Sequence, residues 1–111
     1  MACLFCLIAR GEIPAKMIHE DDQVVAFDDL NPQAPVHVLI VPRQHLDNLL
    51  ALDDPALTLA MLNAAKTVAR EKGINETGFR LLTNVGEDGG QSVPHLHWHL
   101  LGGRRMEWPP G

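Results

Sequence analysis

The chain has 111 residues, of which 46% are hydrophobic, and its formal net charge at pH 7 is −5. A chain of this length buries roughly 65% of its unfolded surface, so we expect a single domain over residues 1–111 with an adequate core. The acidic balance, with Arg104-Arg105 as its one basic cluster, argues against nucleic-acid binding through phosphate neutralisation. An anionic small ligand is compatible with it, because a local field can oppose the global charge.

The N-terminal residues 1–9 are apolar but too few to span a bilayer. Arg10 follows this apolar run, whereas a signal peptide places its positive charge first. Elsewhere the chain has no run without polar residues that is long enough for a membrane helix. We therefore expect a cytoplasmic protein that makes no contact with membranes.

The first elements are predicted to be a short helix and a β-hairpin. Residues 3–10 place their apolar side chains on one helical face, and Gly11 ends this helix. Residues 16–20 and 23–28 have strand composition, and the Asp21-Asp22 turn joins them.

The middle of the chain contains a strand and the one long helix. Residues 36–41 are rich in Val, Ile and Leu and predict a strand, and residues 46–52 predict one or two helical turns. Asp54-Pro55 supplies an N-cap with proline at the first helical position, so a helix is expected over 55–72. Gly73 ends it.

The last third predicts two further strands, at 79–83 and 95–101, joined by a glycine-rich loop at 84–92. The tail 102–111 contains a Trp-Pro-Pro-Gly end that can form neither a helix nor a central strand. Such an extended segment usually packs on something, and a partner subunit is one candidate.

The segment His95-Leu96-His97-Trp98-His99-Leu100-Leu101 alternates histidine with large apolar residues. On a strand, alternate side chains leave the same face, so the three imidazoles are expected on one side and the apolar side chains in the core. Neutral imidazole is a competent nucleophile, and His97 is the natural one because a histidine lies on each side of it. His99 and the segment Gly90-Gln91-Ser92 can hold phosphate oxygens as charge develops.

Several features have more ordinary interpretations. The histidine row, His95, His97 and His99, can be a solvated strand face or a metal-binding row. Three ligands from one strand point in parallel, however, and suit tetrahedral coordination poorly. His37, alone in its strand, decides nothing by its placement. The C-x-x-C pair Cys3 and Cys6 indicates a metal half-site or a redox pair more than a structural disulfide, and two ordinary thiols are an equal alternative.

The histidine row also resembles the His-φ-His-φ-His-φ-φ motif of the histidine-triad (HIT) nucleotide-binding proteins, where φ is an apolar residue. Further segments across nearly the whole chain are similar to the Hint branch of that family. These segments are Gly11-Glu12-Ile13-Pro14-Ala15-Lys16, Asn31-Pro32-Gln33-Ala34-Pro35-Val36-His37, Gly89-Gly90-Gln91-Ser92-Val93, Leu101-Gly102-Gly103-Arg104-Arg105-Met106 and Trp108-Pro109-Pro110-Gly111.

The resemblance implies an α+β, HIT-like fold: a five-stranded antiparallel sheet, one long helix and a short N-terminal helix. It also implies a homodimer in which the sheet continues from one subunit to the other. The implied activity is hydrolysis of nucleoside 5′-phosphoramidates of adenosine or guanosine through a covalent nucleotidyl-histidine intermediate. No cofactor for catalysis is implied.

The resemblance also implies roles for individual residues. His97 is the nucleophile, His99 contacts the phosphate, and both His37 and His95 support and orient His97. Asp29 accepts both ribose hydroxyls, a role that suits a carboxylate. The remaining implied nucleotide-binding residues are Asn84, Gly90, Gln91 and Ser92 at the phosphate and leaving group, Phe5, Ile8, Ile13, Phe27 and Leu30 around the base, and Trp108 reaching across the dimer.

Some positions depart from the Hint pattern. Pro94 stands where many Hint proteins carry an aromatic residue, and Asp28 stands where some carry histidine. The two cysteines resemble those of zinc-bearing HIT members, in which they join two histidines. Here the set is Cys3, Cys6, His45 and His95, four ligands suited to a possible structural zinc.

Three alternative functions remain open from the sequence. The histidine row can bind a catalytic ion that activates water. The protein can be a nucleotide-binding regulatory module in which hydrolysis is incidental. It can also be a dinucleoside polyphosphate hydrolase, as in the related Fhit branch, although the Trp-Pro-Pro-Gly tail resembles the Hint branch instead.

Overall fold

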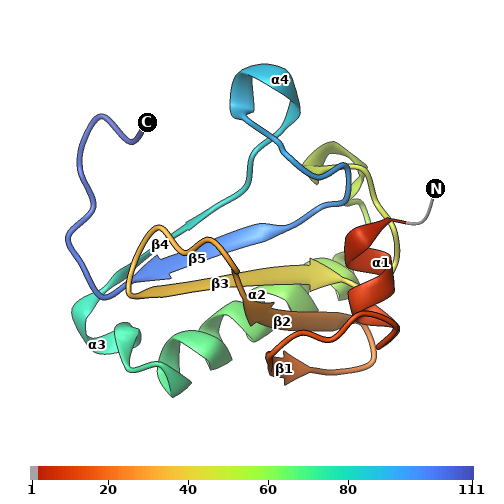
Figure 1. Cartoon of the computed structure of the whole chain (residues 1–111), viewed down its shortest axis with the longest axis horizontal. Coiled ribbons are helices and arrows are strands. Elements are labelled where there is room, and N and C mark those ends of the chain that lie inside the picture. Colours follow the sequence, from red (N-terminus) through yellow and green to blue (C-terminus); the bar gives the residue numbers. More distant parts are fainter. Residues whose placement is uncertain (1–2) are drawn as a thin grey trace.

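The computed structural model describes residues 3–111, so Met1 and Ala2 of the predicted apolar N-terminus lie outside the described residues. Its centre is a five-stranded antiparallel sheet in the order β1-β2-β3-β5-β4 (Figure 1). The strands are β1 (Met17–Glu20), β2 (Val24–Asp28), β3 (Val36–Pro42), β4 (Phe79–Leu82) and β5 (Trp98–Gly102). The helices are α1 (Leu4–Ala9), the 3-10 helix η1 (Leu49–Ala51), α2 (Pro55–Glu71), α3 (Ile74–Thr77) and α4 (Gly86–Gly89). The predicted α+β fold, with a five-stranded antiparallel sheet, one long helix and a short N-terminal helix, is confirmed.

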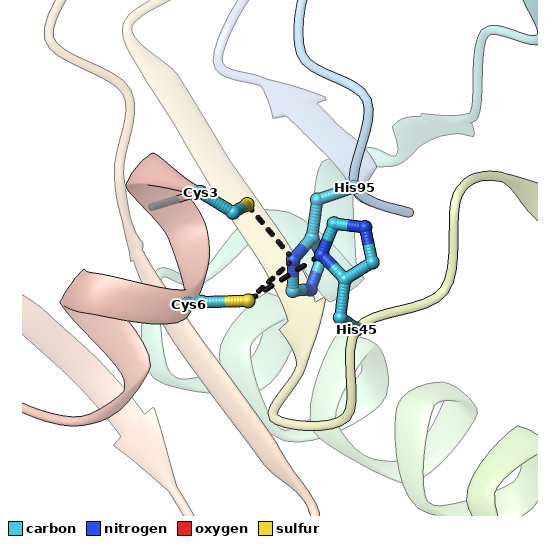
Figure 2. A group of neighbouring side chains, drawn as sticks. All are labelled: Cys3, Cys6, His45 and His95. Atoms are coloured by element: carbon cyan, nitrogen blue, oxygen red, sulfur yellow. Dashed lines mark hydrogen bonds between the residues drawn. The ribbon is translucent and has the colours of Figure 1, made fainter. Parts of the chain in front are cut away.

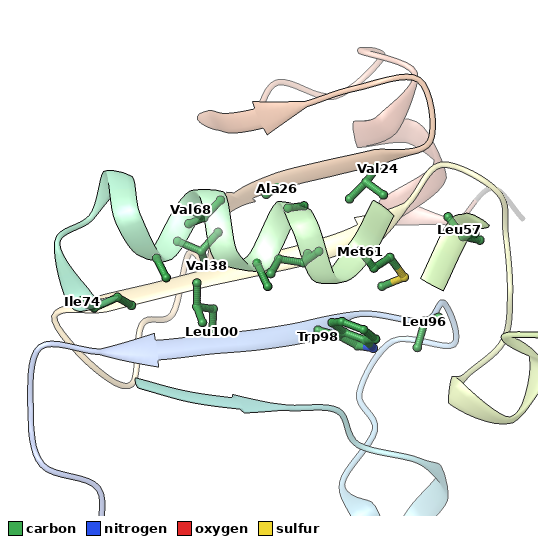
Figure 3. Packing of buried hydrophobic residues seen from close by; sticks show 14 residues of the cluster. Val24, Ala26, Val38, Leu57, Met61, Val68, Ile74, Leu96, Trp98 and Leu100 are labelled. Carbon is green, nitrogen blue, oxygen red and sulfur yellow. The ribbon is translucent and has the colours of Figure 1, made fainter. Parts of the chain in front are cut away.

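The long helix α2 covers one face of the sheet. The Asp54 side chain accepts the Ala56 N–H at 2.9 Å and Pro55 occupies the first turn, so the helix begins where the sequence predicts. Its apolar stripe packs on the inward side chains of β2, β3 and β5, which include those between the histidines of the row (Figure 3). Burial of Leu96, Trp98 and Leu100 in this core therefore leaves the histidines on the other face.

The short helix α1 lies on that other face. Phe5, Ile8 and Ala9 pack there against side chains of β2 and β3, which come from the alternate strand positions. A six-residue helix is not stable in isolation, so this packing holds it in place.

The last strand is shorter than predicted. β5 begins at Trp98, whereas the sequence predicts a strand from residue 95. The Leu96 N–H donates to the Leu46 carbonyl at 2.6 Å, and the His95 N–H donates to the Val93 carbonyl at 2.9 Å. The backbone before Trp98 therefore leaves the strand ladder, because the Leu96 N–H bonds to Leu46 and Pro42, the residue of β3 opposite Leu96, has no N–H to donate.

Two short helices were not predicted from the sequence. α3 follows Gly73, whose φ of 74° ends α2, and α4 lies within the glycine-rich segment 84–92 and projects from the sheet (Figure 1). The tail beyond Gly102 has no regular structure, as predicted. Over residues 3–111 no helix is both long and apolar enough to cross a membrane.

Candidate active site

A pocket of about 490 Å³ lies between α1 and the sheet, on the face opposite α2. Its walls are mainly apolar, and its polar groups come from the histidine row, the end of β2, Lys16 and Ser92. Leu30 is fully exposed, so it contributes to the rim and not to the interior. The predicted site residues that line the pocket are Phe5, Ile8, Ile13, Phe27, Asp29, Leu30, Ser92, His97 and His99.

One ring nitrogen of His97 makes a hydrogen bond within the protein, and the other is free to react. Its ring is 4% exposed, and Nδ1 lies 2.7 Å from the carbonyl oxygen of His95. A carbonyl oxygen only accepts, so Nδ1 carries the proton and donates, which leaves a lone pair on Nε2 of the neutral ring. The Thr83 hydroxyl donates to the His97 carbonyl at 2.9 Å and fixes the backbone below.

A hydrogen-bond relay fixes the opposite tautomer in His99. The Gln33 backbone N–H donates to Nδ1 of His37 at 3.0 Å, so the proton of neutral His37 is on Nε2. That Nε2–H donates to Nδ1 of His99 at 2.9 Å. The proton of neutral His99 is therefore on Nε2, and His99 is a hydrogen-bond donor beside His97, whose ring centroid is 5.0 Å away.

Burial keeps the relay neutral. Burial, together with the neighbouring His97 and His37, lowers the pKa of His99 to about 4. Burial also lowers the pKa of His37, although the nearby Asp29 carboxylate opposes this. At neutral pH both rings are therefore uncharged, as the relay requires.

Asp29 stands at the pocket edge of the relay. One carboxylate oxygen accepts the Asn31 N–H at 2.8 Å, and the other lies 3.4 Å from Nε2 of His37. Asp29, His37 and His99 bring three ligand-type atoms close together. However, the ring centroids of His37 and His99 are 5.2 Å apart, which is about the 2.9 Å N–N distance plus the radii of the two rings. The two ring nitrogens therefore point directly at each other. This arrangement suits a proton held between them and does not suit a metal ion bound by both.

A second cluster lies behind the pocket, between α1 and the loop after β3. Figure 2 shows Cys3 and Cys6 from the N-terminal segment pointing at the rings of His45 and His95. Nδ1 of His95 lies 3.3 Å from Sγ of Cys3 and 3.5 Å from Sγ of Cys6, and Nδ1 of His45 lies 3.4 Å from Sγ of Cys6. We call these four residues the metal cluster.

The metal cluster fits a tetrahedral ion. Ligand atoms about 2.0–2.3 Å from a zinc ion stand about 3.3–3.8 Å apart, close to the distances observed. His95 donates from Nε2 to the Pro42 carbonyl at 2.9 Å, and Nε2 of His45 lies 3.2 Å from a carboxylate oxygen of Asp47. Both outer bonds leave Nδ1 unprotonated and facing the sulfurs, which is the tautomer that a metal requires.

Comparison with known proteins identifies the family. Residues 10–106 match the HIT domain family. The chain belongs to the HIT family. A structure described as a HIT family hydrolase from Legionella pneumophila Philadelphia 1 is 49% identical with a TM-score of 0.95, covering 99% of this chain and 100% of that one.

Two further HIT relatives carry informative names. A histidine triad nucleotide-binding protein from Candida albicans is 32% identical with a TM-score of 0.84, covering 89% of this chain and 73% of that one. A 14 kDa zinc-binding protein from Brassica juncea is 45% identical over 112 residues, covering 97% of this chain and 98% of that protein.

Within the HIT fold, the two histidines expected to support His97 are related to it in different ways. The resemblance implies that His37 orients His97, and the ring of His37 contacts His99, whose ring lies beside that of His97. It implies the same role for His95, whose carbonyl oxygen lies 2.7 Å from Nδ1 of His97 while its ring faces the sulfurs of Cys3 and Cys6.

Four of the predicted nucleotide-binding residues do not line the pocket: Asn84, Gly90, Gln91 and Trp108. The Gly90 N–H is used by the Glu87 carbonyl at 3.0 Å. The Gln91 amide accepts the Gly86 N–H at 3.1 Å and donates to the Asp47 carbonyl at 2.7 Å, so it braces α4 against the loop after β3. Trp108 is 82% exposed.

Sequence reasoning missed two contributors to the site. The backbone N–H of Gln33 sets the tautomer of His37, and the hydroxyl of Thr83 anchors His97. Gln33 lies in the Asn-Pro-Gln-Ala-Pro loop, where the two prolines that shape the turn are the only signal. Nothing in the sequence marks Thr83, because its partner is a backbone group 14 residues away.

Proposed function

We propose that this protein hydrolyses purine nucleoside 5′-phosphoramidates through a covalent nucleotidyl intermediate on His97. The observation that carries the proposal is the complementary pair of tautomers: His97 offers a lone pair on Nε2, and His99 beside it offers an N–H on Nε2. A nucleophile and a donor for the phosphate oxygens are therefore set before substrate arrives. HIT relatives named as hydrolases and as nucleotide-binding support this reading.

The pocket suits the nucleoside. Phe5 and Phe27 are nearly fully buried and, with Ile8 and Ile13, provide an apolar slot for a planar base. Asp29 stands between the slot and His99, and its carboxylate can accept the two ribose hydroxyls. Their hydrogen bonds compete with the long contact to His37, which is the weaker of the two contacts that Asp29 now makes.

The reaction has two balanced steps. Nε2 of His97 attacks phosphorus, the P–N bond breaks, and its electron pair leaves with the nitrogen, which takes up a proton from solvent to become the free amine. Water then attacks the nucleotidyl phosphorus and gives up a proton to solvent. The bond to Nε2 breaks, its electron pair returns to Nε2 of His97, and the nucleoside monophosphate leaves. In both steps the N–H of His99 stabilises charge on the phosphate oxygens. The Nδ1–H bond to the His95 carbonyl stabilises the positive charge that forms on the ring of His97.

The metal cluster is proposed to hold a structural zinc ion. Two thiolates and two neutral imidazoles make a closed set of four ligands, which cross-links α1 to the loop after β3 and to the row. The name of the Brassica juncea relative supports zinc as the metal.

A homodimer is proposed from the chain's exposed edges. β4 is an outer strand of the sheet, its Phe79 is 44% exposed, and Trp108 is 82% exposed on the adjoining tail. Pairing of β4 with a second copy would continue the sheet and allow Trp108 to reach the partner's pocket. Light scattering coupled to size-exclusion chromatography measures the molar mass of the protein. A monomeric mass at micromolar concentration contradicts the homodimer.

A substrate panel tests the function. Adenosine and guanosine 5′-phosphoramidates, diadenosine polyphosphate and AMP are compared at equal concentration with the purified protein. We expect turnover of the phosphoramidates to exceed that of the polyphosphate. If diadenosine polyphosphate is cleaved faster than the phosphoramidates, the protein is instead a dinucleoside polyphosphate hydrolase. AMP binding without turnover of any compound assigns it to the nucleotide-binding regulatory modules.

A further inference from the structure

We propose that α1 is a clip that couples occupancy of the metal cluster to the nucleophile, with Phe5 as a positioning residue for His97. The inference rests on the proposed role of His97 in catalysis. It gives the metal cluster an effect on the active site beyond its effect on stability.

The clip depends on its cysteines because α1 has little stability of its own. The helix has six residues, its N-cap Cys3 makes no side-chain capping bond, and no acidic residue lies in its first turn. Both cysteine carbonyls accept backbone bonds at the ends of the helix: Leu7 N–H donates to the Cys3 carbonyl at 3.0 Å, and Arg10 N–H donates to the Cys6 carbonyl at 3.1 Å. Ligation of Cys3 and Cys6 therefore holds the two residues that accept these terminal bonds.

Phe5 lies between the two cysteines and touches the nucleophile. Its side chain is 5% exposed, and its ring meets that of His97 with centroids 5.0 Å apart at 76°. It also meets His95 at 5.9 Å and Phe27 at 5.7 Å, again edge to face. A shift of either cysteine moves the Phe5 ring, and the Phe5 ring is the surface that sets the orientation of the His97 ring.

His95 supplies the second link. Its ring faces both sulfurs of the metal cluster, and its carbonyl accepts the Nδ1–H that sets the tautomer of His97. Phe5 controls the tilt of the His97 ring and His95 controls its proton, and both contacts start at the metal cluster. Release of the metal therefore loosens both together.

The first test uses ligand-free protein, so that it does not depend on the proposed chemistry. Protein stripped with a chelator is compared with the same protein reloaded with one equivalent of Zn²⁺. In the loaded protein, nitrogen NMR of the His97 ring should show one tautomer, protonated at Nδ1. In the stripped protein we expect a mixture of tautomers, with exchange of the Leu7 and Arg10 amides faster by about tenfold or more and α2 amides unchanged.

The second test compares Phe5→Leu with Phe27→Leu, both zinc-loaded. Each variant trims a buried ring from the same apolar cluster, but only Phe5 contacts His97. Phe5→Leu should mix the tautomers of His97 and slow formation of the covalent intermediate by about tenfold to a hundredfold. Phe27→Leu should leave the His97 spectrum unchanged, and because Phe27 lines the slot for the base it should raise KM.

The outcomes separate this inference from the proposed function. A single unchanged tautomer of His97 in both the stripped protein and the Phe5→Leu variant overturns the clip, whether or not phosphoramidates are hydrolysed. If stripping unfolds the whole chain, the zinc-loaded Phe5→Leu variant decides alone. A mixed tautomer in a protein that hydrolyses no phosphoramidate supports the clip and contradicts the function.

Discussion

Nε2 of His37 and Nδ1 of His99 lie 2.9 Å apart and face each other head-on, so the two imidazoles share one proton. Because the backbone N–H of Gln33 occupies the other nitrogen of His37, the proton has one stable position. The outcome is a neutral His99 whose outer nitrogen is always a donor toward the pocket. In the proposed reaction, His37 acts on the phosphate through His99.

Removal of His37 should therefore impair catalysis without preventing nucleotide binding. In His37→Ala, Nδ1 of His99 has no donor and its ring can adopt the wrong tautomer. We expect kcat to fall by about tenfold to a hundredfold with KM changed less than threefold. Steady-state kinetics check this, with His19→Ala, a histidine paired with Asp21 away from the pocket, as the control. A normal kcat in His37→Ala contradicts the relay.

The relay also predicts how stability depends on pH. The folded protein protonates His99 only near pH 4, whereas the unfolded chain protonates it near the ordinary value of 6.5. Between these values the unfolded state binds more protons, so stability falls as the pH is lowered from 6.5 to 4 and this contribution levels off below. The lowered pKa of His37 acts in the same direction.

His99→Gln should flatten this part of the stability curve. Urea unfolding midpoints of both proteins are measured from pH 7.5 to 4.5, and metal loss at low pH is common to both. The gap between the two curves should begin to change as the pH falls below about 6.5 and should go on changing down to pH 4.5. Parallel curves throughout contradict a depressed pKa at His99.

Asp29 is expected to contribute binding energy more than catalysis. Its replacement by Ala removes charge-assisted hydrogen bonds to the ribose, which costs about 1.5–3 kcal/mol and raises KM by about tenfold to a hundredfold. Asp28→Ala, which removes the neighbouring carboxylate paired with Lys16, is the control and should leave KM within about threefold. A collapse of kcat in Asp29→Ala with KM unchanged shows that Asp29 is not a ribose ligand.

The sheet was predictable because its signals are local. Val and Ile runs mark β2 and β3, alternating apolar residues mark β5, and the Asp54-Pro55 pair marks the start of α2. Where strand β5 begins was not predictable, since the Leu96 N–H bonds to the carbonyl of Leu46, a residue 50 positions earlier in the chain. Strand pairing is decided by residues far away in the chain.

The site divides in the same manner. The histidine row and the C-x-x-C pair are visible as spacings, and their side chains converge in the structure. The partner of each ring is not visible, because it depends on backbone groups such as the Pro42 carbonyl for His95 and the Gln33 N–H for His37. Any residue type except proline can supply a backbone N–H and every residue supplies a carbonyl, so the sequence does not show which ring nitrogen of each histidine carries the proton.

One stability prediction concerns the end of β5. A methyl group at Gly102 would stand 2.8 Å from two side-chain carbons of buried Ile74, so Gly102→Ala should destabilise by about 1–3 kcal/mol. Gly89→Ala, where the nearest atom is 3.5 Å away, is the control. Shortening the neighbour in Gly102→Ala with Ile74→Val should recover part of the loss in urea unfolding. A stable Gly102→Ala contradicts the tight packing of α3 on β5.

The metal cluster predicts how much zinc the protein binds and which substitutions reduce that amount. Native mass spectrometry should find one Zn²⁺ per chain, and Cys6→Ser or His45→Ala should reduce occupancy and lower the melting temperature. His19→Ala should retain the metal. A zinc-free native protein with an unchanged melting temperature after chelation contradicts a structural ion at this place.

The central claim is the covalent intermediate on His97, and one experiment tests it most directly. Adenosine 5′-phosphoramidate is mixed with excess enzyme, quenched at short times, and analysed by intact mass for wild type and His97→Ala. A transient adduct of one AMP on wild type alone, mapped to His97, is the predicted result. Full turnover with no adduct at any quench time, or an adduct that persists in His97→Ala, would contradict the account and indicate an activated water or another nucleophile.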